Sequence, residues 1–137
     1  MKTTYSDESG SAYIYLKSPK SAAFYSVEEE LTNYSPTDVN IDIDEAGEVI
    51  GIELLGVKYL AEQFINPSKL KTTYDKDHSL AYIYLKPPGT KSHKTVEAEM
   101  PDYSSTDVNI DIDQAGEVIG IELIGVKYLK EALTGSS

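Results

Sequence analysis

The sequence of 137 residues contains no cysteine, no tryptophan and no arginine. Without cysteine there is no disulfide framework, no thiolate nucleophile and no cysteine-ligated zinc, and we expect a reduced, cytoplasmic setting. Nothing near Met1 resembles a signal peptide, and the longest apolar stretch, VIGIELLGV, is short and interrupted by Glu53. No segment is therefore expected to span a bilayer.

Basic residues are also scarce. The sequence has twelve lysines and 23 acidic residues, which gives a net charge of −11. Such a surface repels phosphate backbones and anionic lipids, and the absence of arginine removes the usual residue for recognising phosphate or guanine. We therefore expect no nucleic-acid partner and no membrane partner. The charge suits solubility, cations or a basic protein partner.

The chain consists of two tandem copies of one sequence. KTTY at 2–5 returns at 71–74, TDVNIDID at 37–44 returns at 106–113, and AGEVIGIEL at 46–54 returns at 115–123, always with the same offset. A unit of this size is marginal alone. We therefore predict that the repeats, 1–69 and 70–137, pack about a pseudo-twofold axis as a single body, either a monomer or a weak homodimer.

The copies differ most in one segment. SPKSAAFYS at 18–26 becomes PPGTKSHKT at 87–95, which exchanges Phe24 and Tyr25 for His93 and Lys94. The two halves are therefore expected to present different surfaces there.

Each copy alternates polar and apolar residues and then changes period. Val39, Ile41 and Ile43 alternate with polar residues, as in a strand with one solvated face. Residues Val57, Leu60, Ala61 and Phe64 instead have helical spacing, which predicts a helix near 57–65 ended by Asn66-Pro67, with a counterpart near 126–133. The predicted fold class is α+β, with each repeat a mostly antiparallel sheet of about five strands followed by one helix.

The pattern also predicts how the central hairpin of each repeat is paired. A four-residue turn, DEAG, sets Ile41 opposite Ile50 and Val39 opposite Ile52. A three-residue turn would place Ile50 beside Asp42 instead. We expect the four-residue turn.

The same hairpin carries acidic residues at the spacing D-x-D-x-x-G-x5-E, within one ligand of a calcium-binding EF-hand loop. Its fifth position, normally a ligand, is Ala46 in one copy and Ala115 in the other, and strand-like alternation replaces the flanking helices. We therefore predict no dedicated metal site, although loose cation binding by the acidic face stays open. The candidate ligands are Asp42, Asp44, Glu53, Asp111, Asp113 and Glu122.

Other chemical signatures are missing. His78 and His93 do not recur in the other copy, and no nucleophile elbow, HExxH motif or GxGxxG pattern occurs. We predict no catalytic residues and no cofactor. Tyrosine is enriched, and the pairs Tyr13/Tyr15 and Tyr82/Tyr84 belong either to the internal packing of the fold or to an exposed recognition surface.

The order KTTY, AYIYLK, VEEE and VNIDIDEAGEVIGIELLG resembles the YuzE-like family, domain of unknown function 2283. Both repeats fit over nearly their whole length, and D-x-D-x-x-G-x-V-x-G-I-E is the most specific part. The resemblance implies a small β-rich α+β fold with dimer-like packing. It carries no established activity, so no catalytic residue can be transferred, but some members look as if they are encoded beside small toxins, which suggests an antitoxin-like role.

Two hypotheses follow. The first is a non-catalytic interaction module whose acidic hairpin faces or tyrosine-bearing strands contact a basic protein partner, such as a toxin ribonuclease. The second is a small cation-dependent hydrolase or cation-binding protein that uses Asp42, Glu53 and their copies.

Overall fold

Each repeat forms a five-stranded antiparallel sheet followed by a short helical segment, which confirms the α+β two-repeat fold. A computed structural model describes residues 1–64 and 70–134. The first sheet has the order β1-β2-β5-β4-β3 and the second β6-β7-β10-β9-β8. The strands of the first repeat are β1 (Lys2–Ser6), β2 (Ser11–Tyr15), β3 (Tyr25–Glu30), β4 (Asp38–Ile43) and β5 (Val49–Leu55). Those of the second are β6 (Lys71–Asp75), β7 (Leu80–Tyr84), β8 (Lys94–Glu97), β9 (Asp107–Ile112) and β10 (Val118–Ile124).

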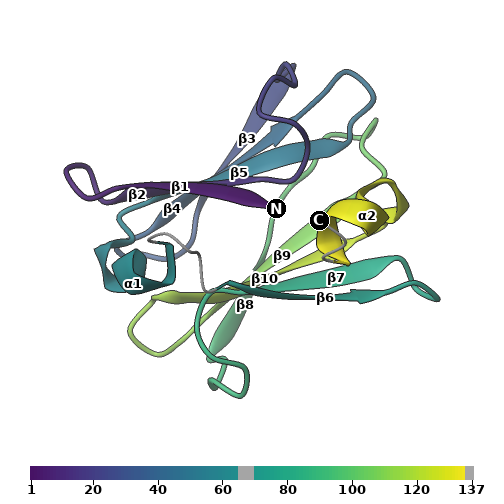
Figure 1. Cartoon of the computed structure of the whole chain (residues 1–137). Coiled ribbons are helices and arrows are strands. Elements are labelled where there is room, and N and C mark those ends of the chain that lie inside the picture. Colours follow the sequence, from purple (N-terminus) through teal and green to yellow (C-terminus); the bar gives the residue numbers. More distant parts are fainter. Residues whose placement is uncertain (65–69, 135–137) are drawn as a thin grey trace.

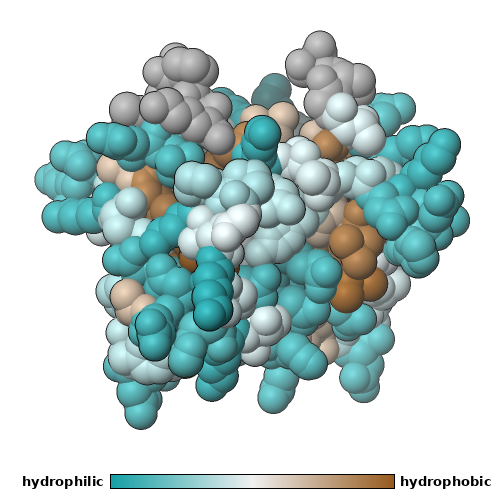
Figure 2. All heavy atoms as spheres, turned by 90° about the horizontal axis from the view of Figure 1, so that it is seen from below, coloured by the Kyte–Doolittle hydropathy of each residue, from teal (hydrophilic) through white to brown (hydrophobic). Residues whose placement is uncertain are grey.

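The two sheets lie one above the other and share one core (Figure 1). The inward residues of β4, namely Val39, Ile41 and Ile43, are fully buried, and their copies in β9 belong to the same hydrophobic cluster. The outward residues are mostly polar, and the face seen in Figure 2 is largely hydrophilic with small, separate hydrophobic areas. Burial of each apolar sheet face against the other repeat therefore explains why the two copies form one body.

The helical segments are shorter than the sequence indicates. A 3-10 turn, η1 (Lys58–Leu60), leads into one turn of α-helix, α1 (Ala61–Phe64). Phe64 stacks on Tyr5 of β1, with ring centroids 6.3 Å apart, at one end of the core. The predicted helix end at Asn66-Pro67 lies outside the described residues.

The second repeat has the same arrangement, in which η2 (Lys127–Leu129) leads into α2 (Lys130–Leu133) and α2 lies against β6. Val126, Leu129 and Leu133 are buried, as their helical spacing predicts. Among the described residues, no helix has the length and apolar character needed to cross a membrane.

The predicted register of the β4–β5 hairpin is wrong. Ile41 pairs with Ile52 and Val39 with Leu54, because five residues, 44–48, connect the strands and Ile50 forms a bulge. The Ile50 carbonyl accepts the N–H groups of Leu16 and Lys17, at 3.0 and 3.1 Å, so the bulge is fixed by the end of β2. Alternation could not reveal it, since Val49 and Ile50 are both apolar and both buried.

Two tyrosines join the repeats. The Val49 N–H, next to the bulge, donates to the Tyr128 hydroxyl of the second repeat (2.8 Å), and that hydroxyl also bonds the hydroxyl of buried Thr106 (2.7 Å). The contact is reciprocal: the Val118 N–H donates to the Tyr59 hydroxyl (2.8 Å). Each repeat thus supplies an acceptor for a buried backbone group of the other, as pseudo-twofold packing requires.

The hairpin turn forms a second contact between the repeats. The Ser104 hydroxyl donates to the Gly47 carbonyl (2.6 Å), and a Cβ on Gly47 would lie 2.7 Å from the Ser104 Cα. Gly47 also has a φ of +80°, a backbone conformation that residues other than glycine rarely adopt. Gly116 lies against Ser35 in the reciprocal contact. The glycine of the acidic motif is therefore needed for the turn and for the approach of the other repeat.

A pair of glycine substitutions separates these two requirements. Gly89 has a φ of +95°, but a Cβ at this residue would have no other atom within 4 Å, so Gly89→Ala is expected to lower the free energy of unfolding by about 1–2 kcal/mol through backbone strain alone. Gly47→Ala adds a clash with Ser104 and is expected to lower it by about 1–3 kcal/mol more. Urea denaturation measures both, and equal losses would contradict the contact.

The tyrosine contacts give a separate expectation. Tyr128→Phe leaves the buried Val49 N–H without an acceptor, so we expect the free energy of unfolding to fall by about 1–3 kcal/mol in urea denaturation. Tyr34→Phe, at a half-exposed ring, is the control and should be nearly neutral. Equal stability of Tyr128→Phe and the unmodified protein would show that the hydroxyl does not hold the repeats together.

Candidate functional site

Asp42, the first acid of the motif, accepts hydrogen bonds from its own sheet. The Tyr13 hydroxyl donates to it at 2.6 Å, and the Ser26 hydroxyl donates to its other oxygen. The Tyr13 ring crosses Gly51, where a Cβ would lie 2.2 Å from the hydroxyl oxygen, so the second glycine of the motif makes room for the ring. Asp111, Tyr82, Thr95 and Gly120 repeat the arrangement. Tyr13 and Tyr82 therefore have a structural part on the outer faces of the sheets.

The Tyr13 phenol has a strongly perturbed acidity. Burial raises the pKa of Tyr13, and the hydrogen bond to the Asp42 carboxylate raises it further, far above the ordinary value of a tyrosine. The same causes raise the pKa of Tyr82 beside Asp111. The phenols therefore stay protonated and act as donors to the two carboxylates.

Asp44, the second acid, organises the turn. One of its oxygens accepts the N–H groups of Ala46 and Glu48, both at 3.0 Å, and the other lies 3.0 Å from the Lys17 ammonium. Lys17 also pairs with Glu48, and its nitrogen lies 5.1 Å from the ring centroid of Tyr128 in the other repeat. Lys86 makes the equivalent contacts to Asp113, Glu117 and the Tyr59 ring.

These contacts keep Asp44 and Lys17 charged. Burial alone would raise the pKa of Asp44, but the bond to Lys17 and the two backbone N–H groups lower it below its usual value. Burial would likewise lower the pKa of Lys17, yet its bonds to Glu48 and Asp44 raise it overall. The charge of Asp44 is therefore balanced within the protein rather than presented to a ligand.

Glu53, the last acid, accepts the side-chain N–H of Asn40 (2.9 Å), and Glu122 does the same from Asn109 (3.0 Å). Every candidate cation ligand thus accepts a hydrogen bond from a group of its own repeat. In residues 1–64 and 70–134, no group of three or more histidine, cysteine, aspartate or glutamate side chains could hold a metal ion.

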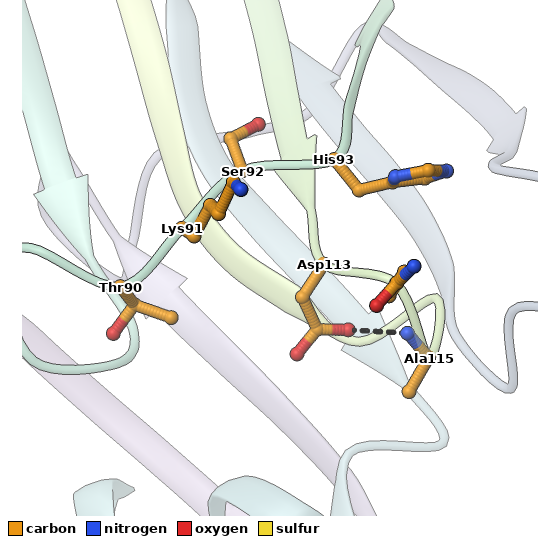
Figure 3. Close-up of a pocket in the computed structure, with 7 residues that line it drawn as sticks. Thr90, Lys91, Ser92, His93, Asp113 and Ala115 are labelled. Carbon is orange, nitrogen blue, oxygen red and sulfur yellow. Dashed lines mark hydrogen bonds between the residues drawn. The ribbon is translucent and has the colours of Figure 1, made fainter.

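The two histidines lie in exposed turns and loops. The His78 ring nitrogen Nδ1 is 2.8 Å from Asp75 in the β6–β7 turn. His93 lines an open hollow between the loop 90–93 and the turn 113–115 (Figure 3). There the His93 ring points away from Asp113, whose carboxylate accepts the Ala115 N–H at 3.0 Å. The hollow therefore does not place a base beside an activated nucleophile.

A second hollow lies on the outer face of the first sheet. It is lined by Glu28, Glu29 and Glu30 of β3, Asp38 and Asn40 of β4, and Leu55 of β5. Cross-strand pairing brings Glu30 opposite Asp38 and Glu28 opposite Asn40. We call the carboxylates Glu28, Glu30 and Asp38 the acidic groove; no lysine or histidine of the described residues lies within 4.0 Å of them.

The acidic groove was not predicted from the sequence. The alternation in VEEE indicates that Glu28 and Glu30 share a solvated face, but only the pairing of β3 with β4 adds Asp38. The second repeat has an equivalent hollow, in which Ala98 stands where the first has Glu29.

Comparison with known proteins places the chain in a family. The family model described as "Protein of unknown function (DUF2283)" matches residues 2–58 and again residues 71–127. The chain belongs to this family. The resemblance seen in the sequence is thereby confirmed for both copies, and the family description names no activity. Tyr59 and Tyr128, which join the repeats, lie immediately after the two DUF2283 matches. Neither a curated protein nor a solved structure matches the chain.

The half-buried phenols of Tyr13 and Tyr82 in the two DUF2283 repeats give a pH dependence. Unfolded tyrosine ionises near pH 10, and Tyr13 and Tyr82 have raised pKa values in the folded protein. Above about pH 10 the unfolded chain loses phenol protons that the folded chain keeps, so the free energy of unfolding falls as the pH rises. The double variant Tyr13→Phe, Tyr82→Phe should show a shallower fall in urea denaturation between about pH 9 and 11.

The matched control is Tyr15→Phe, Tyr84→Phe. These rings lie beside Tyr13 and Tyr82, with centroids 4.6 Å apart in each pair. This variant should keep the alkaline slope of the unmodified protein. If both double variants have that slope, the phenol–carboxylate bonds do not contribute to stability as argued.

Proposed function

We propose that this protein is a non-catalytic interaction module that binds a basic protein partner at the acidic groove of the first repeat. The observation that supports it is the set of three exposed carboxylates, Glu28, Glu30 and Asp38, without a cation of the described residues within ion-pair distance. Other acids of the same sheet, such as Asp44 and Glu48, are paired with Lys17.

Electrostatics favour a positively charged partner at this place. Like charges on neighbouring strands repel each other, and a cationic side chain placed between them relieves the repulsion. The net charge of −11 adds a long-range attraction that speeds the encounter with a basic protein and weakens as salt is added. An antitoxin-like role is one form of this proposal, in which the basic partner is a toxin.

The first repeat suits such a partner better than the second. It has three consecutive glutamates where the second has Glu97, Ala98 and Glu99. The second repeat also has Lys91 in the loop before β8 and Lys94 at the start of β8. The basic residues would repel a cationic partner at the second sheet.

The alternative of a cation-dependent hydrolase has little support. Asp42 accepts two hydroxyl groups, Asp44 accepts two backbone N–H groups and a lysine, and Glu53 accepts an asparagine. A metal or a substrate would have to displace these donors, so we do not propose catalysis.

A pull-down from extract of the native cells tests the acidic groove. The unmodified protein should retain a basic protein at about 50 mM salt and release it at about 500 mM, because screening weakens exposed charge pairs. The variant Glu28→Gln, Glu30→Gln, Asp38→Asn should fail to retain that protein even at the low salt concentration, as judged by mass spectrometry of the eluate.

The second repeat supplies the matched control. Glu97→Gln, Glu99→Gln and Asp107→Asn remove the same charge at the corresponding positions and should leave the retained protein unchanged. Retention of nothing at low salt, or equal loss with both triple variants, would rule out a specific role for the groove.

A further inference from the structure

The most exposed aromatic side chains of the protein include three that lie at one end of the first sheet. Phe24 is 62% exposed, Tyr25 53% and Tyr103 45%. Phe24 and Tyr103 come from different repeats, and their rings meet edge to face with centroids 6.2 Å apart. We call Phe24, Tyr25 and Tyr103 the aromatic cluster. Large exposed rings in a chain of net charge −11 do not serve solubility, so they indicate a contact surface.

The aromatic cluster lies at the start of an edge strand. β3 is the last strand of the order β1-β2-β5-β4-β3, so one of its two sides pairs with no other strand in the described part of the chain. An edge strand presents unpaired N–H and C=O groups to which another extended segment can bond. In β3 these groups run from the aromatic cluster at Tyr25 to the acidic groove at Glu28 and Glu30.

Side-chain alternation defines what such a segment would meet. On β3, the outer face carries Ser26, Glu28 and Glu30. Tyr25 and Val27 pair with Ile43 and Ile41 of β4 and therefore lie on the inner face of the sheet. A strand added beside β3 alternates in the same way, so one set of its side chains would lie beside carboxylates and the other beside the aromatic cluster.

We propose that the edge of β3 is a docking site for an extended basic segment of the partner protein. The segment adds to the first sheet as a sixth strand, with lysine or arginine side chains beside Glu28 and Glu30 and apolar side chains against Phe24, Tyr25 and Tyr103. Backbone hydrogen bonds supply affinity, while charge and the aromatic cluster supply specificity. This inference rests on the proposed function and names the conformation and composition of what binds.

A second copy of this chain is a less suitable occupant. Pairing β3 with β3 of another copy would bring two sets of glutamates together, and acids on an edge strand are a known protection against such pairing. Glu28 and Glu30 thus exclude self-association at the same edge that they make attractive to a basic segment.

The second repeat shows which residues make the difference. Its edge strand β8 is preceded by His93 and begins with Lys94, where the first repeat has Phe24 and Tyr25. Tyr34, the counterpart of Tyr103, is exposed, and the polar His93 stands in the second repeat at the position of Phe24. The edge of β8 should therefore not bind a basic segment.

The probe for the experiment is a capped peptide of about eight residues that alternates lysine and valine, a length typical of a strand. Peptide is added to the full ¹⁵N-labelled protein, and amide hydrogen exchange is followed by NMR. Amides of β3 that face the edge should exchange more slowly when the peptide is bound, because the added strand accepts their hydrogen bonds. Amides of β8 should not change.

Two controls separate strand addition from charge attraction. A peptide of the same length that alternates lysine and proline has the same charge but cannot pair as a strand, and it should bind at least about tenfold more weakly. The variant Phe24→His, Tyr25→Lys, which carries the residues of the second repeat, should also weaken binding of the lysine–valine peptide by about tenfold or more.

The outcomes distinguish this inference from the proposed function. If both peptides bind equally, or if the β3 amides gain no protection, the strand docking is overturned while the groove can still hold a basic protein. If the triple variant Glu28→Gln, Glu30→Gln, Asp38→Asn binds the lysine–valine peptide as well as the unmodified protein, the acidic groove itself is not the binding site. If the lysine–valine peptide does not bind at all, the proposal that the edge of β3 is a docking site is overturned.

Discussion

The hydrogen bond from the Val49 N–H to the Tyr128 hydroxyl, with its reciprocal from Val118 to Tyr59, is the constraint on which the rest of the structure depends. Next to the bulge at Ile50, the backbone N–H at the start of β5 has its acceptor in the other repeat. Neither sheet therefore supplies hydrogen-bond partners for all the backbone groups of its own central hairpin. A buried N–H group without an acceptor destabilises a fold by at least as much as a typical hydrogen bond stabilises it. The exchange of donors and acceptors links the two packed sheets at these points, and it places Tyr128 of η2 beside buried Thr106.

The residues of the acidic motif also have structural roles in the sheet and in its contacts with the other repeat. Asp44 shapes the turn and holds Lys17 against the Tyr128 ring, Gly47 allows Ser104 to approach, and Asp42 anchors the Tyr13 ring above Gly51. The spacing that resembles a calcium loop is therefore explained by the assembly of the fold. The charges left over for a partner lie on β3 and at the start of β4, outside the part of the sequence that first attracts notice.

Much of the fold could be predicted because its physical causes are local. Alternation in Val39, Ile41 and Ile43 sufficed for a half-buried strand, and the spacing of Val57, Leu60 and Phe64 for a helical segment. The bulge could not be predicted, since a run of apolar residues is compatible with several registers. The groove and the aromatic cluster could not be predicted either, because Asp38 joins Glu30, and Tyr103 joins Phe24, only after residues distant in the sequence pair.

The pseudo-twofold arrangement has a consequence for how such a protein can change over generations. A symmetric dimer of single repeats displays every surface residue twice, so a substitution that suits one side is imposed on the other. Here the described hydrogen bonds between repeats involve neither 18–26 nor 87–95, the segments in which the copies differ most. Covalent linkage of the copies frees each half to acquire its own surface chemistry while the hydrogen bonds that join the two halves stay the same.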